Sequence, residues 1–152
     1  MKWVKAGIVG ALGSLVMFAI MMPLIQAGIA PFQLPPSAAA LTSMDMPTKP
    51  LALILHFAYG IFWSIVAVAV YNDQLNVAKG LGVAGFLWLV MMLVHSPIIG
   101  WGIFGTADTS SLPDVLQLGS TMKYIVSTAL LHVVYGLIIG GINPYWISST
   151  RR

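Results

Sequence analysis

Residues 51–71 read LALILHFAYGIFWSIVAVAVY, with no Asp, Glu, Lys or Arg among them. The run is about as long as the ~20 residues that an α-helix needs to cross ~30 Å of hydrocarbon. A charged side chain in hydrocarbon costs several kcal/mol, so a run of this length without charge is typical of a membrane span. We therefore expect residues 51–71 to form a transmembrane helix.

The rest of the chain has the same character, because charge-free segments also cover residues 6–44, 80–107 and 124–150. Only 7% of the residues are charged and 59% are apolar, whereas an ordinary soluble domain carries about 25% charged residues. So few charges cannot cover a globule with a hydrated surface, which excludes a soluble monomer.

We expect an all-α integral membrane protein with a single membrane domain, residues 1–152. Pro23, Pro50, Pro97 and the polar runs limit how far each helix extends. The predicted fold is a four-transmembrane-helix bundle, whose spans cover residues 6–25, 51–71, 80–99 and 124–142.

The basic residues predict the orientation. With the N-terminus inside, Lys2, Lys5, Lys79, Arg151 and Arg152 lie on the inner side, and Lys49 and Lys123 on the outer side. Inner loops of membrane proteins carry the excess of Lys and Arg. We expect a bacterial-type inner membrane protein with both termini cytoplasmic and the long loops 26–50 and 100–123 outside. The pI of 9.4 then reflects topology, and no basic stripe interleaved with aromatics indicates nucleic acid.

Residues 1–30 also have features of a signal peptide, since Lys2 and Lys5 precede an apolar run that reaches Ala30. The run is long for the apolar part of a signal peptide and is followed by Pro31. We expect an uncleaved anchor helix. Three aromatic residues near the predicted outer ends are expected to mark that membrane interface: Phe32, Trp101 and Tyr124.

The sequence also contains an internal duplication. An offset of 74 residues superposes Lys5 on Lys79 and Pro23 on Pro97, and an offset of 76 superposes Leu55-His56 and Tyr59-Gly60 on Leu131-His132 and Tyr135-Gly136. Two tandem helix-loop-helix repeats follow, about 5–71 and 79–142. A repeat with an even number of spans keeps its orientation, so we expect a pseudo-twofold axis along the membrane normal. Ser37 and Ser111 are expected to cap short helices in the two outer loops.

Small residues are spaced for close helix packing. Ala6, Gly10 and Ser14 recur every four residues in the first predicted helix, and Gly80, Gly82 and Gly85 open the third. Such stripes allow helix backbones to approach closely in lipid. We expect them to face the interior of the bundle.

Three histidines are the only ionisable groups of the spans besides the tyrosines. His56 and His132 are repeat-related, each is followed by a Tyr and a Gly, and neutral imidazole is a good ligand for haem iron. One interpretation is a haem b between the second and fourth helices, with Gly60 and Gly136 leaving room for the macrocycle beside Tyr59 and Tyr135. A hydrogen-bonded structural pair is the alternative that the same residues allow, and quinone binding or proton handling is a third.

Copper is a further candidate cofactor. His95 is related by the repeat to Met21, and Met44-Asp45-Met46 follows in the first outer loop. Thioether and imidazole groups bind Cu(I), which makes His95, Met21, Met44 and Met46 candidate metal ligands. Methionine is equally a flexible filler of apolar contacts, so core packing is the competing interpretation.

The segments His95-Ser96-Pro97-Ile98-Ile99-Gly100 and Leu131-His132-Val133-Val134-Tyr135-Gly136 resemble small bacterial inner-membrane proteins of the YagU-like and related uncharacterised families. The resemblance covers mainly residues 79–140. It implies a helical inner-membrane protein and carries over no catalytic residue.

No motif for nucleophilic catalysis occurs in the sequence, which contains no Cys and no Gly-rich loop between a strand and a helix. We expect a non-enzymatic accessory or structural subunit that contacts the lipid bilayer and packs against other membrane subunits, such as those of a bioenergetic complex, or against itself. Two alternatives remain: an electron-transfer protein with haem b or quinone at His56 and His132, and a small-solute transporter with a polar path from Asn143 past Tyr135.

Overall fold

The computed structural model describes residues 1–48 and 50–148, and the side chains of residues 147 and 148 are not described. All regular structure in this part of the chain is helical. The helices are α1 (Lys2–Gln26), α2 (Pro36–Ser43), α3 (Leu51–Tyr71), α4 (Val77–Val90), α5 (Ser96–Ile99) and α6 (Thr121–Ser148).

Four segments are long and apolar enough to cross a membrane: Lys2–Gln26, Leu51–Gln74, Val77–Ile99 and Thr121–Trp146. The four predicted spans are confirmed as helices, and most of them extend a few residues beyond the predicted ends. Pro23 does not end α1, which continues to Gln26 with the proline inside it. The ring lies so close to the helix end that few backbone hydrogen bonds follow it.

The third apolar segment is continuous but not uniform, because a π-helical turn, Met91–His95, joins α4 to α5. Pro97 follows this turn directly in α5. In a regular α-helix the proline ring would clash with the carbonyl group of Leu93, four residues earlier. The wider π turn avoids that clash, and the Ser96 hydroxyl donates a 3.1 Å hydrogen bond to the Met91 carbonyl oxygen.

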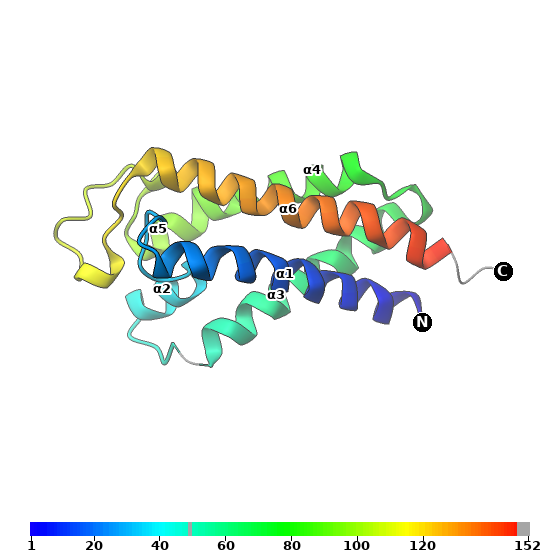
Figure 1. Ribbon diagram of the computed structural model, residues 1–152, viewed down its shortest axis with the longest axis horizontal. Helices are drawn as coiled ribbons and strands as arrows, with labels where there is room; N and C mark the ends of the chain where they lie inside the picture. The colour runs from blue at the N-terminus through cyan, green and yellow to red at the C-terminus, as the bar shows by residue number, and fades with distance from the viewer. Residues whose placement is uncertain (49, 149–152) are drawn as a thin grey trace.

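The long helices run side by side and divide the molecule into two ends (Figure 1). The loop end, on the left of the figure, carries α2, α5 and the segments 27–50 and 100–120. The terminal end, on the right, carries the N-terminus, the short connection between α3 and α4, and the C-terminal part of α6. In cross-section the order is α3, α1, α6, α4: α1 packs against α3 and α6, α6 packs against α4, and α3 and α4 make few contacts.

Glycines allow the close approaches within each helix pair. A Cβ atom at Gly10 would overlap the Gly60 carbonyl oxygen and Ser64 on α3. A Cβ atom at Gly80 would likewise overlap the backbone of Gly136 and Gly140 on α6. The predicted small-residue packing is therefore confirmed for Ala6, Gly10 and Ser14, which are all buried on α1, and for Gly80. It is wrong for Gly82 and Gly85, which are exposed and lie against no other described helix.

The loop end folds back over the bundle. α2 forms in the first loop, although the helix begins at Pro36 and Ser37 provides no capping hydrogen bond. The second predicted short helix is only a 3-10 turn, Asp114–Leu116, and Ser111 does not cap it. Pro113, just before this turn, has φ −50° and ψ 142°, which is not helical and prevents a helix from starting at Ser111.

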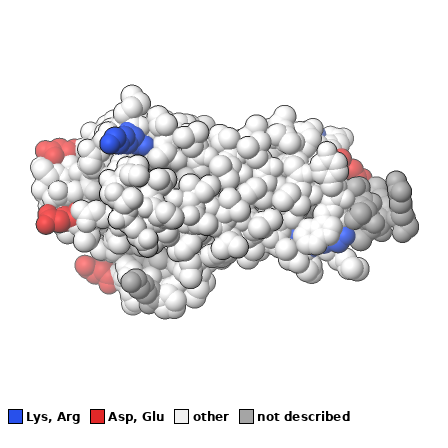
Figure 2. Space-filling view, in the orientation of Figure 1, with Lys and Arg blue, Asp and Glu red and all other residues white. Residues whose placement is uncertain are grey.

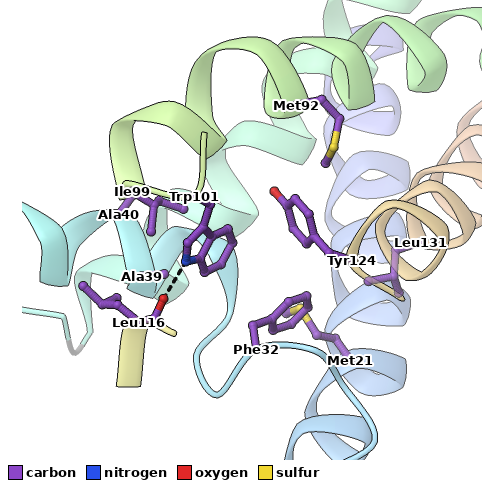
Figure 3. Packing of buried hydrophobic residues seen from close by; sticks show 10 residues of the cluster. All are labelled: Met21, Phe32, Ala39, Ala40, Met92, Ile99, Trp101, Leu116, Tyr124 and Leu131. Carbon is purple, nitrogen blue, oxygen red and sulfur yellow. Dashed lines mark hydrogen bonds between the residues drawn. The ribbon is translucent and has the colours of Figure 1, made fainter. Parts of the chain in front are cut away.

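An aromatic core fills the space beneath these loops (Figure 3). The rings of Trp101 and Tyr124 lie 5.1 Å apart, and Phe32 lies 6.2 Å from each of them. The indole N–H of Trp101 donates a 2.6 Å hydrogen bond to the Leu116 carbonyl oxygen. These three aromatics are buried, so the prediction that they mark a membrane interface is wrong: the loops cover them.

Candidate functional site

The six residues expected around a haem lie in the middle of the bundle and at its loop-end half, on α3 and α6. The hydrogen bond of His56 on α3 is to α1 and not to its repeat partner. Its Nε2 atom lies 3.0 Å from the Ser14 carbonyl oxygen on α1, and its ring centroid lies 6.0 Å from that of Phe18. Ser14 returns the contact, since its hydroxyl lies 3.5 Å from the His56 carbonyl oxygen. His56 thus links α3 to α1.

His132 on α6 is buried and makes a different contact. Its Nδ1 atom lies 2.8 Å from the Thr128 carbonyl oxygen, one turn earlier in its own helix. Thr128 accepts a 3.2 Å hydrogen bond from the Trp88 indole N–H on α4. The two repeat-related histidines therefore belong to different helix contacts, α1 with α3 and α4 with α6.

Atoms of neighbouring helices occupy the space beside Gly60 and Gly136. A Cβ atom at Gly60 would overlap the Ser14 hydroxyl, and a Cβ atom at Gly136 would lie 2.8 Å from the Cβ atom of Ala84. The space that a flat macrocycle would need at these positions is thus used for helix packing. Haem binding gains no support from this geometry and stays a prediction.

The two repeat-related tyrosines also differ. Tyr135 is 3% exposed, and its hydroxyl donates a hydrogen bond to the Gly60 carbonyl oxygen on α3. Tyr59 is 46% exposed and stacks edge-on against Trp63 of its own helix. Tyr135 thus links α6 to α3, whereas the ring contact of Tyr59 with Trp63 stays within α3.

The candidate copper ligands lie in different surroundings, and copper binding stays a prediction. Met21 is buried in the aromatic core at the loop end, whereas Met44 and Met46 are exposed in the loop after α2. His95 lies in the π turn, and its Nδ1 atom is buried without a hydrogen-bond partner in the described part of the chain. Among the described residues, no three His, Cys, Asp or Glu side chains are grouped so that they could hold a metal ion.

A series of side-chain hydrogen bonds near the terminal end links three helices. Asn143 on α6 is fully buried, and its side-chain N–H groups donate to the Ser64 hydroxyl oxygen at 3.1 Å and to the Ile139 carbonyl oxygen at 3.0 Å. Ser64 on α3 in turn donates a 2.7 Å hydrogen bond to the Ala6 carbonyl oxygen on α1. Asn143 and Tyr135, expected along a transport path, are thus both buried and bonded to α3.

Two hollows lie on the surface of the loop end. One is an apolar trough of about 500 Å³ between α1 and α6, and Lys123 is among its lining residues. The other is a polar hollow of about 710 Å³ between the segment 28–33 and the loop 108–119, with Asp108 in its lining. Neither hollow was predicted from the sequence. The signal for the trough is present in the sequence, where apolar residues recur every four positions at Met122, Val126, Leu130 and Val134.

Asp108 is the charged group of the polar hollow. The Ser110 backbone N–H donates a 2.9 Å hydrogen bond to its carboxylate. This hydrogen bond holds the pKa of Asp108 below its ordinary value of 3.8. The side chain therefore carries a negative charge over the whole physiological range of pH.

Comparison with known proteins yields no match: no protein-family model matches the chain, and no curated protein or solved structure is significantly similar to it. The resemblance to the YagU-like families stays a prediction.

Proposed function

We propose that the chain is an integral membrane protein that acts as a non-enzymatic packing subunit within a larger membrane assembly. The observation that carries this proposal is an uncovered small-residue face on α4. Gly82 and Gly85 are exposed, and a Cβ atom at either would meet nothing within 4 Å. Gly80, two residues before Gly82 and on another side of α4, is instead packed against α6. A face of this kind allows a partner helix to approach closely.

The surface supports membrane insertion. In Figure 2 acidic side chains gather at the loop end, lysine side chains lie at both ends, and the belt between them is uncharged in this view. Large apolar side chains are exposed along all four long helices, among them Ile8, Phe62, Phe86 and Leu130. Exposure of these side chains to water is unfavourable, whereas contact with lipid hydrocarbon is not.

We further propose that the terminal end lies in the cytoplasm of a bacterial-type cell and that the membrane is the inner membrane. Three described basic residues lie in helix ends at the terminal end, Lys2 and Lys5 at the start of α1 and Lys79 at the start of α4, whereas Lys123 lies at the start of α6, at the loop end. Lys49, Arg151 and Arg152 fall outside the described residues. The bias agrees with an inside location for the terminal end.

Contacts at the terminal end support the proposed tandem repeat. The Lys5 amino group lies 5.6 Å from the Trp146 ring at the end of α6, and the repeat-related Lys79 lies 5.1 Å from the Tyr71 ring at the end of α3. Each lysine thus sits against the aromatic end of the other repeat. The bundle departs from the repeat symmetry in one respect: the repeat would relate the α1–α6 contact to the α4–α3 contact, but α1 and α6 pack closely while α3 and α4 make few contacts.

The polar side chains also fit a structural role. Those that reach between the long helices end on carbonyl or hydroxyl groups of a neighbouring helix: His56 on Ser14, Trp88 on Thr128 and Asn143 on Ser64. Hydrogen bonds of this kind hold helices together in lipid. They leave these groups engaged in packing rather than presented to a substrate.

Co-purification in a mild detergent tests the packing role. The wild-type chain is expected to migrate in a complex larger than its own mass, and Gly82→Leu with Gly85→Leu is expected to release it. Gly141→Leu is the matched control, since Gly141 is also open to a Cβ atom but lies on α6. A wild-type chain that is monomeric and brings down no partner would overturn the packing role.

Membrane insertion and orientation need a separate measurement. The sequence contains no Cys, so single cysteines can be introduced without removing native ones. Ala107→Cys at the loop end is expected to react with an impermeant thiol reagent in intact cells, and Gln74→Cys at the terminal end only after lysis. The reverse pattern would contradict the orientation, and release of the protein by alkaline carbonate would contradict insertion.

A further inference from the structure

The apolar trough between α1 and α6 is formed by two ridges. On α6, Met122, Val126, Leu130 and Val134 follow one another at four-residue intervals, and on α1 the facing ridge contains Ile20 and Leu24. Residues at this interval lie on one face of a helix. The trough is therefore an apolar groove that runs parallel to the helix axes on the outside of the bundle.

The dimensions of the trough match one acyl chain. At ~1.5 Å per residue, the α6 ridge from Met122 to Val134 is about 18 Å long, slightly more than the ~15 Å depth of one leaflet of hydrocarbon. The volume of about 500 Å³ lies within the range of small-molecule sites. The ridge begins at the loop end of α6, where a lipid headgroup would lie in the proposed orientation.

The polar hollow adjoins the trough. Ala30, Pro31 and Phe32 line both, so these three residues form a shared wall. Beyond the wall the lining turns polar, with Gln33, Asp108, Ser110 and Gln117. An amphiphile that lies along both hollows would pass from an apolar to a polar surface in the same order as a lipid passes from tail to headgroup.

The two charges also have the order of a zwitterionic headgroup. Lys123 belongs to the lining of the trough, near the start of α6, and Asp108 belongs to the lining of the polar hollow beyond the shared wall. In an aminophospholipid the phosphate is attached nearer to the acyl chains, and the ammonium group ends the headgroup. Lys123 is thus placed for the phosphate and Asp108 for the ammonium group.

We propose that the trough and the polar hollow together bind one glycerophospholipid with a primary ammonium headgroup, taken from the outer leaflet. One acyl chain lies in the trough, Lys123 pairs with the phosphate and Asp108 with the ammonium group. The site rests on the proposed membrane insertion, since the trough meets lipid only there. It is independent of the packing role, because it lies on α1 and α6 rather than on the α4 face.

Native mass spectrometry tests this site. The full chain is transferred from nanodiscs of equal phosphatidylethanolamine and phosphatidylglycerol into mild detergent, and retained lipid is counted by mass. We expect one phosphatidylethanolamine per chain to be retained in preference to phosphatidylglycerol. Val126→Trp places an indole in the trough and is expected to lower retention of both lipids about tenfold.

The charged residues separate the two headgroup contacts. Lys123→Gln is expected to weaken both lipids about equally, because both carry a phosphate. Asp108→Asn is expected to reduce the preference for phosphatidylethanolamine about threefold, as befits a solvent-exposed ion pair. Lys79→Gln and Asp45→Asn are the matched controls, since neither residue lines the two hollows, and both are expected to bind lipid as the wild type does.

Several outcomes would overturn the site. Equal lipid retention by the wild type and by Val126→Trp, with both proteins eluting as folded protein, would exclude the trough as the acyl-chain site. Leu130→Trp supplies a second blocking variant on the same ridge. A preference for phosphatidylglycerol that Asp108→Asn leaves unchanged would remove the ammonium contact. If the chain resists carbonate extraction but retains no lipid, insertion stands and the lipid site fails.

Discussion

The hydroxyl of Tyr135 on α6 donates a hydrogen bond to the carbonyl oxygen of Gly60 on α3. The glycine thus takes part in two contacts, since its missing side chain leaves room for Ser14 of α1. Gly60 is the point where α1, α3 and α6 meet. Its repeat partner, Gly136, receives no such bond from Tyr59, which is 46% exposed.

Removing this hydroxyl tests how much the contact stabilises the bundle. Tyr135→Phe is expected to lower the free energy of unfolding by about 0.5–1 kcal/mol, the usual value for one hydrogen bond between helices. Tyr59→Phe is the control and is expected to change it by less than half as much. Reversible unfolding in mixed detergent measures both. An equal loss in the two variants would contradict the assignment.

Ser64 and Asn143 are expected to be energetically coupled. Each single change to Ala removes their 3.1 Å hydrogen bond, so the double variant should lose less stability than the two single variants together. The expected coupling energy is about 0.6 kcal/mol, the average for polar pairs between membrane helices. A double-mutant cycle measures it. Strict additivity would show that the two side chains act independently.

Gly80 and Gly82 should respond oppositely to the same substitution. Gly80→Ala forces a Cβ atom into the backbone of Gly136 and Gly140 and is expected to destabilise the chain by about 1–3 kcal/mol. Gly82→Ala meets open space and is expected to be neutral or to stabilise by up to about 1 kcal/mol through helix propensity. Thermal unfolding of the purified chain compares them, and similar losses would contradict the packing described for α4.

The Trp101 indole is expected to hold the second loop in place. Trp101→Phe keeps an aromatic ring but removes the hydrogen bond to the Leu116 carbonyl oxygen. We expect faster hydrogen exchange across residues 106–119 and a loss of about 1–2 kcal/mol, because the carbonyl group is left buried and unpaired. Trp3→Phe, at an exposed position, is the control. Unchanged hydrogen exchange in residues 106–119 would show that the Trp101 indole does not hold the loop.

The acid dependence of the second loop is expected to follow Asp108. Its pKa is held below 3.8 by the Ser110 backbone N–H, so the folded loop favours the carboxylate. The stabilisation is complete above the ordinary pKa and is lost as the pH falls through the lower folded value. The Ser110 amide proton, followed by NMR, should titrate with a midpoint below 3.8 and should lose this transition in Asp108→Asn. A midpoint at or above 3.8 would contradict the contact.

The helices could be predicted from the sequence because charge is excluded from hydrocarbon over a whole span, and such a signal is local. Although Gly82 and Gly85 are exposed, the inward positions of Ser14, His56 and Tyr135 could be predicted from the stripes of small and polar residues. The bonding partners of these side chains could not be predicted, because an imidazole on an inward face can hydrogen-bond to a carbonyl group or bind a metal equally well. The repeat gave no reason to distinguish Tyr59 from Tyr135, since only the order of helices in space decides which of them has a neighbour.

The helix order has a consequence for how the chain is made. Gly13 on α1 lies against the ring of Tyr135 on α6, and α1 emerges from the ribosome well before α6. At translation rates of about 5–20 residues per second, the α6-facing side of α1 waits about ten seconds for its partner. During that interval α1 can pack against α3 but not against α6, so a nascent chain arrested before Thr121 would leave that side of α1 uncovered.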